Sequence, residues 1–324
     1  MKKKSKRIKS KKPESKTSFS LTDVISMQDF SKHDIEFILD KASQLELMHS
    51  SKKKTILFGK TVATLFFEPS TRTRLSFEKA AQDLGAEVIG FADPNTSSSG
   101  SKGESFSDTI KVVERYADLI IARTPIEGAP RRAAEISSKP IINAGDGSNQ
   151  HPTQTLLDLY TIKKTFGKID GLKIGFSGDL KYGRTVHSLS KALSHYKVDQ
   201  YFIAPKELEM PQYYVENAKK SGKVKLTEDL YKYLGELDIL YATRIQKERF
   251  PDPIEYQRIK NVYILDSKIL SKVKKTFKIM HPLPRVNEID PSLDETPHAL
   301  YFDQLSNGIP IREALISILT GVKK

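Results

Sequence analysis

The 324-residue sequence predicts an α/β fold of two domains, each a parallel sheet flanked by helices. Short apolar runs alternate with helix-period segments, which is typical of parallel sheets covered by helices. The alternation restarts after a long amphipathic segment at 152–166, so the chain contains two successive α/β halves. Polar clusters follow several of the predicted strands. Because ligands bind at the carboxyl ends of strands in open α/β sheets, we expect the active site in the cleft between the two domains.

The domain limits follow from composition and from the bridging segment. Residues 1–16 hold eight Lys and one Arg against one Glu, which is +8 of the chain's net charge of +13. This segment cannot build a core, so we expect a disordered basic tail. Residues 17–151 are predicted to form the first domain and 152–305 the second. The C-terminal helix, at about 306–324, is expected to pack back on the first domain.

The expected elements alternate regularly along the chain. In the first half we predict helices over 31–48, 106–116 and 131–137 and strands over 61–67, 87–91, 118–122 and 140–143. The Ser- and Gly-rich stretch 93–104 is predicted to be a mobile loop. In the second half we predict helices over 152–166, 185–196 and 311–319 and strands over 172–177, 200–203, 238–241 and 276–280.

Composition excludes several classes of protein. The chain has no Cys, which excludes disulfides and cysteine metal sites. No stretch approaches the roughly 20 apolar residues that span a bilayer, and no apolar run follows the basic N-terminus. We therefore expect a cytoplasmic protein without a membrane partner. The body of the chain lacks the interleaved aromatic and basic residues of a nucleic-acid surface, although a non-enzymatic nucleic-acid-binding protein acting through the tail remains the distant alternative.

The stretch that follows the first strand predicts an anion site. Pro69 ends the strand, and Ser70 and Thr71 can cap a helix whose apolar stripe starts at Leu75. The first turn of a helix offers unpaired backbone N–H groups at the positive end of its macrodipole. Arg72 and Arg74 can add bidentate contacts to a phosphate or a carboxylate.

His151 also lies at a predicted helix start, just before Pro152. The positive end of a helix disfavours an imidazolium ion, so we expect a neutral ring that can donate one hydrogen bond to a carbonyl oxygen. On position alone, a helix-capping histidine is an equal interpretation. The glycine loop at 178–183 lacks the G-x-G-x-x-G spacing, which argues against a dinucleotide site.

The run Ser70-Thr71-Arg72-Thr73-Arg74 resembles the carbamoyl-phosphate signature of the aspartate/ornithine carbamoyltransferase family. The run His151-Pro152-Thr153-Gln154 resembles the second signature of that family. The resemblance extends from about residue 30 to the C-terminus. It implies a carbamoyl-phosphate-binding first domain, an aspartate-binding second domain, and no metal or cofactor. The implied reaction joins carbamoyl phosphate and L-aspartate into N-carbamoyl-L-aspartate and phosphate, an early step of pyrimidine biosynthesis, by direct amine attack with oxyanion stabilisation.

The resemblance also assigns roles to residues at matching positions. It implies a catalytic set of Arg72, Thr73, Arg123 and His151. The residues implied to bind carbamoyl phosphate are these four with Ser70, Thr71, Gln154, Leu283 and Pro284. Those implied to bind aspartate are Lys102, Arg184, Arg244 and Gln246. In the family, a serine and a lysine of the Ser/Gly loop reach a neighbouring subunit, which implies a homotrimer with shared sites. Lys102 matches that lysine, Ser98 matches the serine, and Ser97 matches it nearly as well. A separate regulatory chain is a further partner that the resemblance allows.

Two features favour aspartate over ornithine as the acceptor. Arg184 and Arg244 each follow a predicted strand of the second domain, and two arginines suit a dicarboxylate. Pro282 stands in the His281–Arg285 turn where ornithine enzymes typically carry a cysteine, and the Ser-Met-Gly loop expected for ornithine is absent. A carbamoyltransferase for another amine, such as ornithine, is the nearer alternative.

Overall fold

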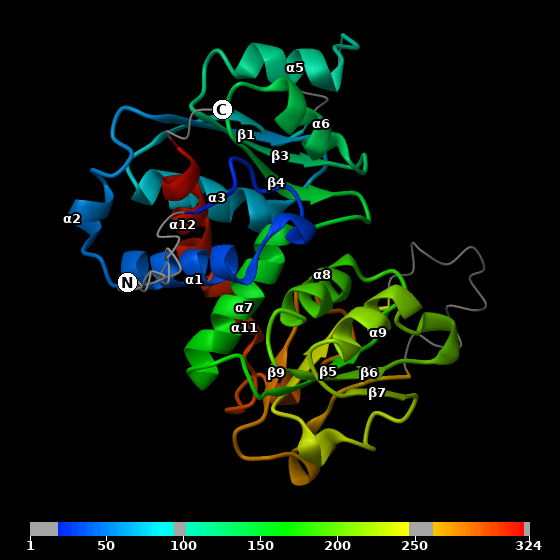
Figure 1. Ribbon diagram of the computed structural model, residues 1–324. Coiled ribbons are helices and arrows are strands. Elements are labelled where there is room, and N and C mark those ends of the chain that lie inside the picture. The colour runs from blue at the N-terminus through cyan, green and yellow to red at the C-terminus, as the bar shows by residue number, and fades with distance from the viewer. Residues whose placement is uncertain (1–18, 94–101, 246–261, 321–324) are drawn as a thin grey trace, which may run out of the picture.

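Figure 1 shows the computed structural model of the chain, in which residues 19–93, 102–245 and 262–320 are described. Two domains each contain one parallel sheet flanked by helices, which confirms the predicted fold class. The basic tail 1–16 and most of the Ser/Gly loop lie outside the described residues. Within the described ranges, no helix combines the length and the hydrophobicity needed to cross a bilayer.

The first domain is built on four parallel strands in the order β2-β1-β3-β4. Their bounds are Thr61–Phe66 for β1, Glu87–Phe91 for β2, Leu119–Thr124 for β3 and Ile141–Asp146 for β4. Its helices are α1 (Lys32–Glu46), α2 (Ser50–Lys53), α3 (Thr71–Asp83), α5 (Phe106–Val113) and α6 (Ala129–Ile136). Strands β1, β3 and β4 are almost entirely buried, as expected for a sheet covered by helices.

The second domain is built on five parallel strands in the order β7-β6-β5-β8-β9. Their bounds are Lys173–Ser177 for β5, Asp199–Ile203 for β6, Val224–Thr227 for β7, Ile239–Ala242 for β8 and Lys278–Met280 for β9. Its helices are α8 (Arg184–Leu193), α9 (Gln212–Lys219) and α11 (Tyr301–Ser306). Strands β6 and β7 lie on one side of β5, and β8 and β9 lie on the other. The strand order therefore changes direction between β5 and β8, and ligands usually bind at the carboxyl ends of two such strands.

Helix α7 (Pro152–Phe166) runs between the two domains (Figure 1). It begins at His151 and ends at Gly167, whose φ of 72° suits a glycine C-cap. The predicted amphipathic pattern is wrong, because all but one of the residues from Pro152 to Ile162 are buried. Contacts with α1, α8, α11 and α12 cover it on several sides. This burial makes α7 a rigid support for the residues at its N-terminus.

Helix α12 (Gly308–Leu319) packs against α1 and α3 of the first domain and also against α7. Its apolar residues Ile311, Leu315 and Ile316 are fully buried. Glu313 is buried with them and lies 2.8 Å from Lys53 Nζ at the end of α2. A buried carboxylate depends on such a partner, and burial raises the pKa of Glu313 despite the lysine.

Several element boundaries differ from the predictions. Strand β3 continues to Thr124, so Arg123 lies within the strand and not after it. Helix α5 ends at Val113, short of the predicted 116. Helix α2, strand β7 and helix α11 were not predicted. Strand β7 is short and half-exposed at the sheet edge, so it has too few apolar residues to give a strand signal.

We predict that Lys53→Met destabilises the protein by about 3 kcal/mol, because it leaves the buried Glu313 carboxylate without its cation. Chemical denaturation monitored by circular dichroism measures this change. Lys52→Met is the matched control: Lys52 is exposed, and its replacement should change the free energy of unfolding by less than about 0.5 kcal/mol. Equal effects of the two substitutions would contradict the assignment.

Candidate active site

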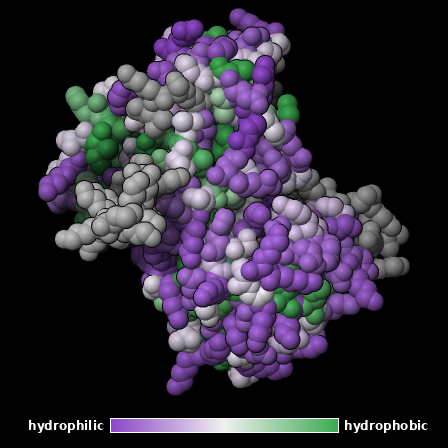
Figure 2. All heavy atoms as spheres, in the orientation of Figure 1, coloured by the Kyte–Doolittle hydropathy of each residue, from purple (hydrophilic) through white to green (hydrophobic). Residues whose placement is uncertain are grey.

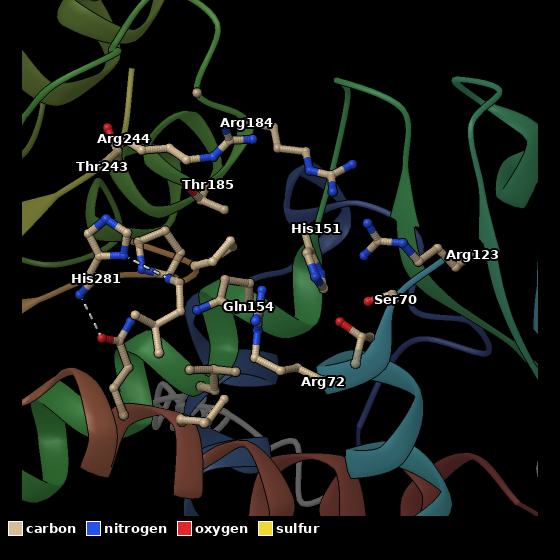
Figure 3. A pocket seen from close by; sticks show the side chains of 18 of the residues that line it. Ser70, Arg72, Arg123, His151, Gln154, Arg184, Thr185, Thr243, Arg244 and His281 are labelled. Carbon is tan, nitrogen blue, oxygen red and sulfur yellow. Dashed lines mark hydrogen bonds between the residues drawn. The ribbon is translucent and has the colours of Figure 1, made fainter. Parts of the chain in front are cut away.

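A cleft of about 400 Å³ lies between the two domains. The described residues give its lining five arginines, namely Arg72, Arg123, Arg184, Arg244 and Arg312, and a single carboxylate, that of Glu68. Figure 3 shows several of these side chains pointing into the same space from both domains. A concave surface with this charge balance attracts and holds anions.

The start of α3, where the sequence predicts an anion site, forms one part of the cleft lining. Ser70 occupies the N-cap with extended backbone angles, but its hydroxyl makes no capping hydrogen bond, contrary to the expected capping role. Ser70, Arg72 and Thr73 line the cleft, and Thr73 is buried. Thr71 is exposed and is not among the lining residues, so only its backbone N–H belongs to this helix start. An uncapped helix N-terminus leaves donors available for a bound anion.

Arg74 does not join Arg72 in the cleft, which corrects the expected pair of anion-binding arginines. Its Nη1 lies 3.7 Å from Glu78 Oε1, one helical turn further along α3. Residues at i and i+2 of a helix point in different directions, so a single helix start cannot present both side chains to one ligand.

Arg123 reaches the cleft from the end of β3 and is only 9% exposed. One Nη donates to the carbonyl oxygen of Ala144 at 3.4 Å, and the other lies 3.4 Å from Glu68 Oε1. Its buried Nε has no hydrogen-bond partner within the described residues. A buried donor without a partner is costly, so this guanidinium is suited to receive an acceptor from a ligand.

His151 is held by the turn between β4 and α7. The buried carboxylate of Asp146 accepts hydrogen bonds from the backbone N–H groups of Gln150 and Gly128, at 3.0 and 2.9 Å. His151 sits at the N-cap of α7 without a side-chain capping bond, so the capping interpretation is wrong. Burial, reinforced by Arg184 and Arg123, lowers the pKa of His151 well below 6.5. The ring is therefore neutral at pH 7 and carries one N–H.

The opposite wall comes from the second domain. Arg184 is the first residue of α8 and donates to the carbonyl oxygen of Gly147, across the cleft in the first domain. Arg244 follows β8. At Gly145, whose φ is 121°, a Cβ atom would stand 3.3 Å from Arg123 Nη1 and 3.6 Å from Arg184 Nη2. A glycine there lets the two guanidinium groups flank the same piece of backbone.

Three helices thus begin at the cleft, because Ser70, His151 and Gly183 are the N-caps of α3, α7 and α8 and all three line it. Ser70 and His151 make no side-chain capping bond, and Gly183 has no side chain with which to make one. By contrast, the caps of α1 and α5, Ser31 and Ser105, do so. The positive ends of three macrodipoles add to the arginine charge in the cleft.

The turn at 281–285 closes the remaining side of the cleft, and Leu283 and Pro284 line it. The peptide bond between these two residues is cis. His281 is buried behind the turn, and its Nδ1 accepts a hydrogen bond from the backbone N–H of Leu283 at 2.9 Å. Figure 3 shows this bond and a second one, which the backbone N–H of His281 donates to Gln304 Oε1.

Not every predicted residue lies in the cleft. Lys102 is exposed and does not line it. Ser97, Ser98 and Gln246 lie outside the described residues. Sequence reasoning missed Arg312, a buried arginine on α12. Its guanidinium carbon lies 5.0 Å from the centroid of the Phe77 ring. Burial lowers its pKa to about 10. A single arginine within the apolar run 308–319 is the sequence signal that would have indicated it.

The fold and the site define a two-domain α/β protein with an arginine-rich cleft between the domains. Residues 22–164 match the family model described as "Aspartate/ornithine carbamoyltransferase, carbamoyl-P binding domain". Residues 170–319 match the model described as "Aspartate/ornithine carbamoyltransferase, Asp/Orn binding domain". The chain belongs to the aspartate/ornithine carbamoyltransferase family.

Individual relatives extend this comparison. The aspartate carbamoyltransferase catalytic subunit of Thermococcus onnurineus is 58% identical over 303 residues, covering 93% of this chain and 97% of that protein. The structure of the catalytic subunit of Methanocaldococcus jannaschii aspartate transcarbamoylase is 53% identical with a TM-score of 0.86, covering 92% and 98%. Trypanosoma cruzi aspartate transcarbamoylase in complex with N-(phosphonacetyl)-L-aspartic acid is 35% identical with a TM-score of 0.86, covering 92% and 96%.

We predict that the His151 imidazole titrates well below pH 6.5 in the folded protein, because it is buried among arginines. As pH falls through about 6.5, the imidazole becomes protonated in the unfolded chain but stays neutral in the folded protein. The free energy of unfolding therefore decreases as pH falls through this range. ¹⁵N NMR of the imidazoles, with His151→Asn for assignment, measures the midpoint. Added inorganic phosphate should raise it by offsetting the arginine charges. A midpoint near 6.5 without phosphate would contradict the electrostatic account.

Proposed function

We propose that this chain transfers the carbamoyl group of carbamoyl phosphate to the α-amine of L-aspartate, forming N-carbamoyl-L-aspartate and phosphate, an early step of pyrimidine biosynthesis. One observation carries the proposal: a single cleft joins Arg72 and Arg123 of the first domain to Arg184 and Arg244 of the second. Opposed arginines suit two anionic substrates, one phosphorylated and one a dicarboxylate. Family membership and the names of the relatives support the same reaction.

The phosphate half of the reaction is assigned to the start of α3. Ser70, Arg72 and Thr73, together with the backbone N–H groups at Thr71 and beyond, would hold the phosphoryl oxygens. The second substrate is assigned to the other domain, where Arg184, Arg244 and Gln246 would hold the two aspartate carboxylates. The bond between Arg184 and the Gly147 carbonyl supports this role, because a carboxylate is a stronger acceptor than the carbonyl that it would replace.

The chemical step needs an acceptor for developing negative charge. The neutral amine nitrogen attacks the carbamoyl carbon and a C–N bond forms. The C–O bond to phosphate breaks, and the phosphate leaves with the electron pair and takes up the proton that the amine nitrogen loses. Thr73, Arg123 and neutral His151 are proposed donors to the carbamoyl oxygen. One such donor contributes roughly 3 kcal/mol of transition-state stabilisation. Gln154 and the carbonyl groups of Leu283 and Pro284 would receive the carbamoyl N–H groups.

No protein nucleophile is required, because phosphate is already a good leaving group. The two domains can accelerate the reaction by holding both substrates together, an effect that reaches ~7–11 kcal/mol in well-oriented systems. Figure 3 supports this role, because the labelled residues of both domains converge on one space. The rigidity of the buried helix α7 supports accurate placement of His151 and Gln154.

The active unit is proposed to be a homotrimer in which each cleft receives Lys102 and a loop serine, Ser98 or Ser97, from a neighbouring subunit. The exposure of Lys102 outside its own cleft supports this assignment. Leu47 and Phe58, on either side of α2, are 85% and 84% exposed. Figure 2 shows hydrophobic side chains at the edge of the molecule where Figure 1 places α2, and an exposed apolar patch favours contact with another subunit. A cytoplasmic location and a separate regulatory chain stay predictions.

We predict product from carbamoyl phosphate with L-aspartate and none with L-ornithine, measured by mass spectrometry of the carbamoylated amine. Arg184→Met and Arg244→Met should each raise the KM for aspartate about 30-fold or more, because each removes a charge-assisted hydrogen bond to a carboxylate of the substrate. The KM for carbamoyl phosphate should change little. Arg132→Met is the matched control, since Arg132 is exposed outside the cleft and pairs with Glu135. Turnover with ornithine alone would overturn the assignment of the second domain.

A further inference from the structure

A buried chain of hydrogen bonds runs behind the cleft and ends at Gln154. Its centre is Asp158, which is fully buried one turn after Gln154 on α7. Asp158 Oδ1 accepts from Gln154 Nε2 at 2.9 Å and from Gln304 Nε2 at 2.6 Å, and Oδ2 accepts from the Tyr241 hydroxyl at 2.9 Å. The three donors belong to α7, α11 and β8, so Asp158 joins three elements. Burial raises its pKa to about 7.

The direction of these hydrogen bonds is fixed by a backbone group. The N–H of His281 donates to Gln304 Oε1 at 2.9 Å, and a backbone N–H cannot act as an acceptor. Gln304 must therefore present its Nε2 to Asp158, which makes Oδ1 of Asp158 an acceptor whether or not Oδ2 holds a proton. An amide that faces an acceptor must offer its NH₂ group. Gln154 accordingly directs Nε2 at Asp158.

The consequence appears on the cleft side of Gln154. Its side chain lies between His151 and the turn that carries His281 (Figure 3). With Nε2 held by Asp158, the remaining amide atom is Oε1, which has no hydrogen-bond partner among the described residues. Oε1 can only accept a hydrogen bond. A carbamoyl group offers two N–H donors to such an acceptor, whereas an acetyl group of similar shape offers none.

We propose that Asp158 is a positioning residue that makes the cleft selective for a carbamoyl group over an acyl group without N–H, by holding Gln154 with Oε1 toward the ligand. The inference rests on the proposed carbamoyl transfer and adds the origin of its donor selectivity. A site built to pair with a substrate N–H rejects the analogue that lacks it, because its own polar group is then left without a partner. The same chain ends at the 281–285 turn, so one carboxylate orders both sides of the carbamoyl pocket.

The test compares carbamoyl phosphate with acetyl phosphate, each offered with L-aspartate. In both reactions the amine nitrogen forms a bond to the acyl carbon and phosphate leaves, giving N-carbamoyl- or N-acetyl-L-aspartate. Mass spectrometry of these products excludes background hydrolysis of either phosphate. The measured quantity is the ratio of kcat/KM for carbamoyl phosphate to kcat/KM for acetyl phosphate. A purely structural role for Asp158 would lower both values together and leave the ratio unchanged.

Two substitutions separate polarity from charge. In Asp158→Asn, the amide oxygen can still accept the hydrogen bond from Gln304 Nε2. The Tyr241 hydroxyl can rotate to accept a hydrogen bond from the new NH₂ group. The ratio of the two kcat/KM values should therefore stay near that of the wild type. Asp158→Leu has a similar shape but no acceptor, which frees Gln154 to turn its NH₂ toward the ligand. The ratio should then fall about tenfold, the worth of one hydrogen bond. Asp158→Ala replaces the leucine variant if circular dichroism shows that the latter is unfolded.

The outcomes are distinct. A fallen ratio in the leucine or alanine variant with a retained ratio in Asp158→Asn supports the proposal. An unchanged ratio in a folded variant without the acceptor overturns it, and so does an equal fall in Asp158→Asn, which would assign selectivity to the charge. Wild-type protein that forms no N-carbamoyl-L-aspartate would instead overturn the proposed function. Inorganic phosphate binding, measured by calorimetry, should be unchanged in all variants, because Asp158 does not line the cleft.

Discussion

The structure depends on positive charge gathered at one place with little acid to balance it. Five arginine side chains and the N-termini of α3, α7 and α8 meet in one cleft, and Glu68 is the only carboxylate that the described residues contribute to its lining. Like charges at short range repel one another, more strongly where protein excludes water. The arrangement persists because each group is fixed by the fold: Arg123 by a strand, and Arg184 by its helix start and the Gly147 carbonyl. A bound anion relieves this repulsion, so binding and stability are coupled.

The same field determines the state of the neutral groups around it. His151 remains unprotonated because burial and neighbouring arginines act in the same direction on its pKa. The carboxylates that the site uses for support are held away from the ligand. Asp146 orders the turn before His151, and Asp158 orders the side chain of Gln154. Cations therefore face the substrates, while buried carboxylates hold the hydrogen-bonding groups in position from behind.

Much of this arrangement could be predicted from the sequence. The alternation of strands and helices is local, so the fold class and most elements followed from periodicity. Candidate residues followed because the carboxyl ends of parallel strands meet at one edge of a sheet. Side-chain direction was harder to predict: Arg74 pairs with Glu78, although its position beside Arg72 suggested the ligand. Arg312 and Asp158 were missed because their roles come from contacts between segments far apart in the chain, which no local pattern records.

The central claim is that both walls of the cleft act on one bound molecule. Calorimetry with N-(phosphonacetyl)-L-aspartic acid, which joins a phosphonate to a dicarboxylate, tests it most directly. The account predicts that this compound binds at least about 100-fold more tightly than phosphate or succinate alone, since linked groups pay the entropy of association once. It also predicts that Arg72→Met in one domain and Arg184→Met in the other each weaken binding severely. Binding that needs only one of the two arginines would contradict a shared cleft.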